Sequence, residues 1–227
     1  MLRRSALPIS RRSKEWKTNG MPTSLQRPKP RLRDQILEQT FLFLRKFHPA
    51  RERVRLGERN DQTERDHVAR YQFAKQFCKG KKVADIACGT GYGSKILLDV
   101  AASVDSYDRE QLCENRIIDL EKESWADAYD VIVSFETIEH LENPEFFLAN
   151  IQKTSRLAII SSPIGEFRGY NPHHKQVWTM DEFSQLTARY FDCTYYYQKA
   201  ELIHQDASMP ISFAIMVGKP LSSKSSN

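Results

Sequence analysis

The stretch VADIACGTGYG, residues 83–93, decides the architecture of the chain. It begins with an apolar run typical of a buried strand, and three glycines then lead into GYGSKILLDVA, whose apolar residues have helical spacing. Glycine lets a backbone approach a ligand closely, and the free amides at the start of a helix attract an anion. The sequence therefore predicts a strand, an anion-binding turn and a helix.

The segments around this stretch alternate between strand-like and helix-like patterns, which is typical of an α/β fold with a mostly parallel sheet covered by helices. The last two strand-like segments are joined only by the loop HQDASMP, so we expect them to pair antiparallel at the end of the sheet. We predict strands at 81–88, 102–108, 115–121, 129–135, 156–163, 193–203 and 211–219, helices at 34–47, 67–78, 91–101, 144–153 and 180–191, and a charged loop at 50–66.

The composition is that of one globular domain with an appendage. The 227 residues are 40% apolar, which is enough to bury an ordinary core. The four cysteines include no C-x-x-C pair, so we expect neither a zinc knuckle nor a disulfide framework, and we expect a reducing compartment. The sequence contains neither an apolar run of about 18 residues nor a secretory signal. We therefore expect a soluble, cytoplasmic protein without a membrane partner.

The basic character of the chain lies in residues 1–33. This leader has seven Arg and three Lys against one acid, a net charge of +9, which leaves −4 for the remainder of a chain whose total is +5. We expect a disordered, solvated leader, and a mitochondrial transit segment is the alternative, since MLRRSALPISRRS is rich in Arg and Ser and free of acids. We divide the rest into a helix and loop at 34–60, a folded domain at 61–219 and a disordered tail at 220–227.

The glycine spacing bears on which anion the turn binds. A dinucleotide pyrophosphate and a methionine carboxylate are both candidates, and glycine-rich turns also occur without any ligand. Gly89, Gly91 and Gly93 form G-x-G-x-G, whereas the dinucleotide fingerprint is G-x-G-x-x-G. Asp108 ends the next predicted strand, where a carboxylate can accept hydrogen bonds from both ribose hydroxyls. Asp108 supports a nucleoside cofactor without choosing between the two kinds.

Four segments between residues 56 and 219 resemble class I S-adenosylmethionine-dependent methyltransferases, and more narrowly bacterial methyltransferases associated with glycan and sugar modification. They are LGERNDQTERDHVARYQFA, DIACGTGYGS, SFETIEHLENPEFFL and NPHHKQVWTMDEF. The resemblance implies S-adenosyl-L-methionine as cofactor and a Rossmann-like fold with a seven-stranded, mostly parallel sheet whose last strand is antiparallel. It also implies the cofactor contacts: Asp85, Gly89 and Gly91 around the methionine moiety, Asp108 on the ribose, and Asp119 with Leu120 beside the adenine.

The sequence departs from the family between Asp108 and the next strand. Only REQLCEN separates them, where the family carries a full helix. We expect another element, the helix at 34–47, to shield the sheet there.

A second group of polar residues follows the fourth predicted strand. Glu136, Glu139 and His140 are spaced i, i+3 and i+4, so they can share one face of a helix. His173 and His174 lie in the loop after the fifth strand, which reaches the same sheet edge in this architecture. Carboxylates and imidazoles that converge there suit a divalent metal. The alternative is that the glutamates complement a helix dipole and His140 packs locally.

The pattern E-x-x-E-H followed by a later His resembles the metal ligands of small-RNA terminal 2′-O-methyltransferases, and its first part resembles quinone-biosynthesis O-methyltransferases. This resemblance implies Glu136, Glu139, His140 and His174 as ligands, with His174 preferred to His173 by its distance from Trp178. Mg, Mn, Co, Fe and Zn all suit such a set. A metal lowers the pKa of a bound hydroxyl; without one, His140 or His174 would act as general base.

We expect an O-methyltransferase acting on a sugar or another small hydroxylated molecule. The main alternatives are 2′-O-methylation of an RNA end and a non-catalytic adenosyl-binding partner subunit; a nicotinamide oxidoreductase fits the glycine spacing least. A nucleic-acid partner is disfavoured, because the remainder of the chain has a net charge of −4 and no basic stripe with interleaved aromatics. The sequence leaves the oligomeric state open.

Overall fold

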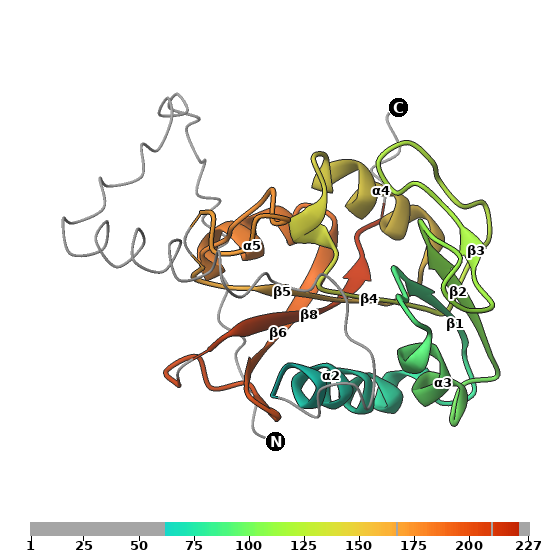
Figure 1. Ribbon diagram of the computed structural model, residues 1–227, viewed down its shortest axis with the longest axis horizontal. Helices are drawn as coiled ribbons and strands as arrows, with labels where there is room; N and C mark the ends of the chain where they lie inside the picture. Colours follow the sequence, from blue (N-terminus) through green and yellow to red (C-terminus); the bar gives the residue numbers. More distant parts are fainter. Residues whose placement is uncertain (1–61, 167, 210, 223–227) are drawn as a thin grey trace, which may run out of the picture.

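The structure, a computed structural model, describes residues 62–166, 168–209 and 211–222. Within these residues one sheet of eight strands carries α2 and α3 on one face and α4 and α5 on the other (Figure 1). The predicted leader at 1–33 and the helix at 34–47 lie outside the described residues. None of the helices that the structure describes is long and apolar enough to cross a membrane.

The strand order is β3-β2-β1-β4-β5-β8-β6-β7. The first five strands of the chain run parallel to one another, and β8 lies antiparallel between β5 and β6. The predicted α/β fold and the antiparallel pairing near the C-terminus are therefore confirmed. The strands are β1 Lys82–Ile86, β2 Ser103–Asp108, β3 Arg116–Ile117, β4 Val131–Phe135, β5 Ala158–Pro163, β6 Phe191–Lys199, β7 Leu202–His204 and β8 Phe213–Pro220.

The eighth strand is a difference from the seven that we predicted. The segment 193–203 was expected to form one strand, but the chain turns at Ala200, which has a φ of 51°. It then returns as β7, which pairs antiparallel with β6 from Tyr197 opposite His204 to Lys199 opposite Leu202. Alanine adopts a positive φ only rarely, and it is not among the residue types that indicate a turn, so the sequence did not predict this one.

The described helices begin and end close to the predicted positions, with two exceptions. Helix α5 was predicted to end at residue 191, but it ends at Thr187 and Phe191 already belongs to β6. Helix α2 begins at Gln62, so the end of the segment predicted as a loop is helical. Asn143 caps α4 by accepting a hydrogen bond from the Phe146 amide at 3.1 Å, and Thr179 forms a capping box with Glu182 at the start of α5. The elements are α2 Gln62–Cys78, α3 Tyr92–Leu98, the 3₁₀ helix η1 Ile138–His140, α4 Pro144–Thr154 and α5 Met180–Thr187.

No helix forms between β2 and β3, as the short REQLCEN segment predicts. Asn115 holds this loop together instead: its Oδ1 accepts from the amides of Leu112 and Cys113, both at 3.2 Å, and its Nδ2 donates to the carbonyl of Glu110 at 2.9 Å. Beside the loop β3 is only two residues long, and Ile117 is 62% exposed. The expected shielding by the helix at 34–47 concerns residues outside those that the structure describes.

Gly93 marks the closest approach of α2 to α3. A Cβ atom at this position would overlap the ring of Tyr71 at its Cζ, Cε1 and Cε2 atoms. The ring cannot easily move aside, because Tyr71 packs edge-on against Phe135 and its hydroxyl donates to Asp85. The third glycine of the turn is therefore required for helix packing.

We expect Gly93→Ala to lower the free energy of unfolding by about 1–3 kcal/mol, the usual cost of overpacking a core. Urea denaturation followed by circular dichroism measures this. Leu98→Ala is the control on the same helix, because Leu98 is 55% exposed and its change should stay within about 0.5 kcal/mol. Equal stability of the two variants would contradict the close contact.

Candidate functional site

A cleft of about 680 Å³ opens where the carboxyl ends of β1, β2 and β4 meet. Ligands of open α/β sheets bind at this edge. The glycine turn lines one part of the cleft together with Asp108, and η1 lines another part together with the loop at 171–175. Members of both groups of residues that the sequence singled out therefore line one cavity.

The glycine turn and Asp108 are joined directly. The Gly89 amide donates to Asp108 Oδ2 at 2.9 Å, and the Glu110 amide donates to Oδ1 at 3.2 Å. Ala87, Gly89 and Gly91 all have positive φ, between 56° and 78°. A left-handed alanine is strained, and such strain is common where a backbone is shaped for a ligand.

Asp85 lies behind the turn and is fully buried. It accepts hydrogen bonds from Ser94 Oγ at 2.6 Å and from the Tyr71 hydroxyl at 3.1 Å, so it ties β1 to α3 and α2. Burial raises the pKa of Asp85 to about 6, although both hydrogen bonds act in the opposite direction. The residue is not among those that line the cleft. Its carboxylate supports the turn from within the core.

Of the other expected cofactor residues, Gly89, Asp108, Asp119 and Leu120 line the cleft, whereas Gly91 does not. Asp119 also accepts a hydrogen bond from the Glu121 amide at 3.0 Å. Gly91 is covered by Cys113, whose Sγ would be 2.7 Å from a Cβ at this position.

The structure brings three of the four expected metal ligands together. Within the described residues, Glu139, His140 and His174 each offer a ligand atom, and these atoms lie within 4.8 Å of one another. The rings of the two histidines are 4.8 Å apart and nearly perpendicular. The Glu139 carbonyl accepts from the amides of Lys175 and Gln176, both at 2.9 Å, which holds the loop against η1.

The surroundings of His174 fix the orientation of its ring. Nδ1 lies 2.7 Å from Glu166 Oε2, and Nε2 lies 2.9 Å from the side-chain nitrogen of Asn171. Because an amide nitrogen donates, Nε2 accepts and the Nδ1 proton is donated to Glu166. A carboxylate that orients an imidazole in this way is common around metal ligands and general bases.

Glu139 is completely buried. Oε2 accepts from Ser162 Oγ at 3.3 Å, whereas Oε1 has no hydrogen-bond partner among the described residues. Burial, followed by the nearby charges of Glu136 and Glu166, raises the pKa of Glu139 well above its usual range. A buried oxygen without a partner is costly, and a cation at this position would offset that cost.

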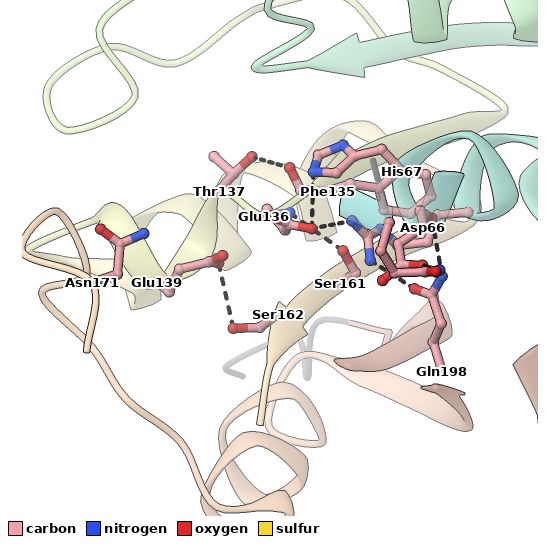
Figure 2. Close-up of polar contacts among 12 residues, drawn as sticks. Asp66, His67, Phe135, Glu136, Thr137, Glu139, Ser161, Ser162, Asn171 and Gln198 are labelled. Carbon is pink, nitrogen blue, oxygen red and sulfur yellow. Dashed lines mark hydrogen bonds and ion pairs between the residues drawn. The ribbon is translucent and has the colours of Figure 1, made fainter. Parts of the chain in front are cut away.

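Glu136 is not part of this cluster, although the i, i+3, i+4 spacing predicted that it would be. Figure 2 shows its side chain turned towards α2, where Oε1 accepts from Arg70 Nη2 and from His67 Nε2, the latter at 2.9 Å. Burial works to raise the pKa of Glu136, but the charges of Arg70 and His67 outweigh it and lower the pKa to about 2. The structure therefore groups only three of the four expected ligands, because the fully buried Arg70 takes Glu136 as its counter-ion.

Three residues of α2 that the sequence did not single out bind carboxylates at or behind the cleft. Tyr71 holds Asp85, Arg70 holds Glu136, and His67 joins Glu136 to the Tyr92 hydroxyl, which lies 2.9 Å from its Nδ1. Arg70 also donates to Gln198 Oε1 at 2.6 Å. A signal was present, since polar residues at positions 67, 70 and 71 of a helix share a face with the buried Ala74.

Comparison with known proteins gives the fold a family. The profile of a methyltransferase domain family matches residues 51–203. A probable S-adenosylmethionine-dependent methyltransferase of Mycolicibacterium smegmatis is 26% identical over 143 residues, which cover 54% of this chain and 56% of the relative. The chain thus spans about half the length of the curated relatives that it matches.

Two solved structures share the fold at low identity. The DhpI–SAH complex is 16% identical with a TM-score of 0.53, and the match covers 68% of this chain and 83% of that one. The small RNA methyltransferase HEN1 is also 16% identical with a TM-score of 0.53, and it covers 77% of this chain but 27% of its own. At these identities the likeness concerns the fold alone.

We expect Arg70→Met to destabilise the protein by about 1–3 kcal/mol, because the Glu136 side chain, which is 23% exposed, loses its Arg70 partner and keeps the contact with His67. Thermal and urea unfolding measure the change. Arg65→Met is the control on the same helix: Arg65 pairs with Glu201 at 2.9 Å at the surface, where such pairs contribute about 0–1 kcal/mol. A similar loss in both variants would mean that the buried pair has no special role.

Proposed function

Because the chain belongs to the methyltransferase domain family, we propose that it is an S-adenosylmethionine-dependent O-methyltransferase whose acceptor is a sugar or another small hydroxylated molecule. The observation that carries the proposal is that one cleft is lined both by the Gly89–Asp108 pair and by His140 and His174, which form a cluster with the buried Glu139. The first group suits a nucleoside cofactor, and the second suits activation of a hydroxyl.

The chemistry needs a hydroxyl that has been activated and correctly placed. The acceptor oxygen forms a bond to the methyl carbon while the bond from that carbon to the sulfonium breaks, which leaves neutral S-adenosylhomocysteine. The hydroxyl proton must pass to the protein or to solvent. In-line placement of the two reactants supplies most of the remaining acceleration.

The three-residue cluster fits a divalent ion, since it combines two imidazoles with a buried carboxylate whose Oε1 has no partner among the described residues. Glu139, His140 and His174 would hold the ion, and Glu166 would orient His174. When bound, the ion would lower the pKa of the acceptor hydroxyl. Mg²⁺, Mn²⁺, Fe²⁺, Co²⁺ and Zn²⁺ all bind such mixed sets.

His174 also suits proton transfer without an ion. Its Nδ1–H donates to Glu166, and the acceptor hydroxyl would replace Asn171 at Nε2. This is the arrangement of a general base oriented by a carboxylate. His140 is placed differently, because its Nδ1 donates to the carbonyl of His173 at 3.0 Å.

The alternative of an RNA-end 2′-O-methyltransferase rests on the E-x-x-E-H pattern and on the fold shared with HEN1. Glu136, the first residue of that pattern, pairs with Arg70 and His67, which weakens this alternative. The experiment that tests the function is transfer of a labelled methyl group from S-adenosylmethionine to a panel of glycosides, catechols and RNA ends. Exclusive transfer to RNA would replace our proposal.

We expect the protein to bind S-adenosylhomocysteine with micromolar affinity, roughly −8 kcal/mol, and NAD much more weakly. Asp108→Asn should weaken binding by about 1.5–3 kcal/mol, the scale of hydrogen bonds to a charged group. Titration calorimetry measures both, with Asp99→Asn as the control, because Asp99 is an exposed residue at the far end of α3. Preferential binding of NAD would refute the proposed cofactor.

We expect a strong chelator to abolish methyl transfer while cofactor binding persists, and added Mg²⁺, Mn²⁺ or Co²⁺ to restore it. His174→Ala should lower turnover by at least about 10²-fold. His173→Ala should have a much smaller effect, because its side chain is exposed and lies outside the cluster. Full activity in chelator, in protein free of metal, would leave the histidines as the only candidates for activating the hydroxyl.

A further inference from the structure

A second cavity lies directly beside the cofactor cleft. Its volume is about 370 Å³, within the range of ligand pockets, roughly 300–1,000 Å³. It is bounded by the first turns of α2, the loop after β5 and the start of β8. Neither the glycine turn nor Asp108 lines it, so it is separate from the region expected to hold the cofactor.

Three contacts join this second cavity to the reacting end of the cleft. Thr63 and Glu136 line both spaces. Glu166 lines the second cavity, and its carboxylate accepts the hydrogen bond from His174, which lines the cleft. A molecule in the second cavity would therefore lie next to the end of β4 and next to Glu166, the residue that orients His174.

The charge on the walls of the second cavity selects against anions. Asp66, Glu136 and Glu166 contribute three carboxylates, whereas Arg70 is the one cationic side chain among the described residues that line it. Two of the guanidinium nitrogens already bind Glu136 and Gln198. A phosphate would meet uncompensated negative charge, but the hydroxyls of a neutral molecule can donate to carboxylate oxygens.

The remaining wall is mixed: Ile164, Tyr170, Ile211 and Phe213 are apolar or aromatic, and Gln62, Thr63 and Ser212 are polar. Tyr170 is 38% exposed, and the ring of Phe213 lies 4.3 Å from the Arg70 guanidinium carbon. The C–H face of a sugar ring can pack on an aromatic side chain such as Tyr170.

We propose that the second cavity binds the methyl acceptor and that it takes a neutral, polyhydroxylated ring such as a sugar, and excludes phosphorylated acceptors. The proposal rests on the proposed function and gives the acceptor a place: its ring lies against Tyr170, and its reacting hydroxyl points past Glu136 and Thr63 into the cleft. Asp66 and Glu166 accept hydrogen bonds from its other hydroxyls.

The test measures binding directly, so that it does not depend on turnover. Saturation-transfer NMR is recorded on the protein loaded with S-adenosylhomocysteine, with a panel of methyl glycosides as probes. We expect at least one glycoside to bind, and Ser212→Trp, which places a large side chain on the cavity wall, to weaken that binding at least about tenfold. Tyr170→Ala should weaken it as well.

Ser208→Trp is the matched control, because Ser208 is exposed on the same connection between β7 and β8 and lines neither cavity. All variants should bind S-adenosylhomocysteine as the unaltered protein does, which shows that they are folded. A ribonucleoside 5′-monophosphate should not compete with the glycoside.

The outcomes separate this proposal from the proposed function. Glycoside binding that Ser212→Trp blocks, without methyl transfer to any hydroxyl, would support the binding site and refute the function. Methyl transfer to a glycoside with an unchanged KM in Ser212→Trp would support the function and overturn the binding site. Absence of binding by every glycoside, or displacement by the nucleoside monophosphate, would also overturn it.

Discussion

The guanidinium of Arg70 is fully buried between α2 and the sheet, and much of the site depends on how its charge is balanced. Moving such a group out of water costs several kcal/mol unless a partner of opposite charge is held beside it. Glu136 is that partner, and Gln198 on β6 takes a second guanidinium nitrogen. The pair fixes α2 against the ends of β4 and β6, and Glu136 has a φ of 49°, a conformation that a non-glycine residue adopts only under such constraint.

The sequence predicted the parts of the fold that follow from local pattern. The alternating apolar segments and the glycine turn were sufficient to predict an α/β sheet with an antiparallel C-terminal strand. The short segment after Asp108 predicted separately that no helix follows β2. The short strand β7 was not predicted, because the turn before it is made by Ala200 and alanine is not a residue typical of turns. The first turn of α2 escaped because its charged residues resemble a loop, whereas in the structure Gln62 Nε2 donates to Asp66 Oδ1 at 2.6 Å along the helix.

Some members of the candidate site could be predicted from the sequence, but its geometry could not. The i, i+3, i+4 argument assumed that Glu136, Glu139 and His140 lie on one regular helix. In the structure β4 ends at Phe135, Glu136 has a left-handed backbone, and only Ile138–His140 forms a 3₁₀ turn. The spacing therefore brings Glu139 and His140 towards His174 but turns Glu136 to the opposite side. Only a tertiary contact, the buried charge of Arg70, decides this, and no local pattern contains it.

One helix consequently serves both halves of the site. Tyr71 holds Asp85 behind the glycine turn, and Arg70 with His67 holds Glu136, which separates the cofactor cleft from the second cavity. Thr63, in the first turn of the same helix, lines both spaces. Residues of α2 line both cavities, and α2 is held by the balanced charge of Arg70 together with the buried Tyr71, Ala74 and Cys78. The buried ion pair thereby links the region suited to the methyl donor with the region suited to its acceptor.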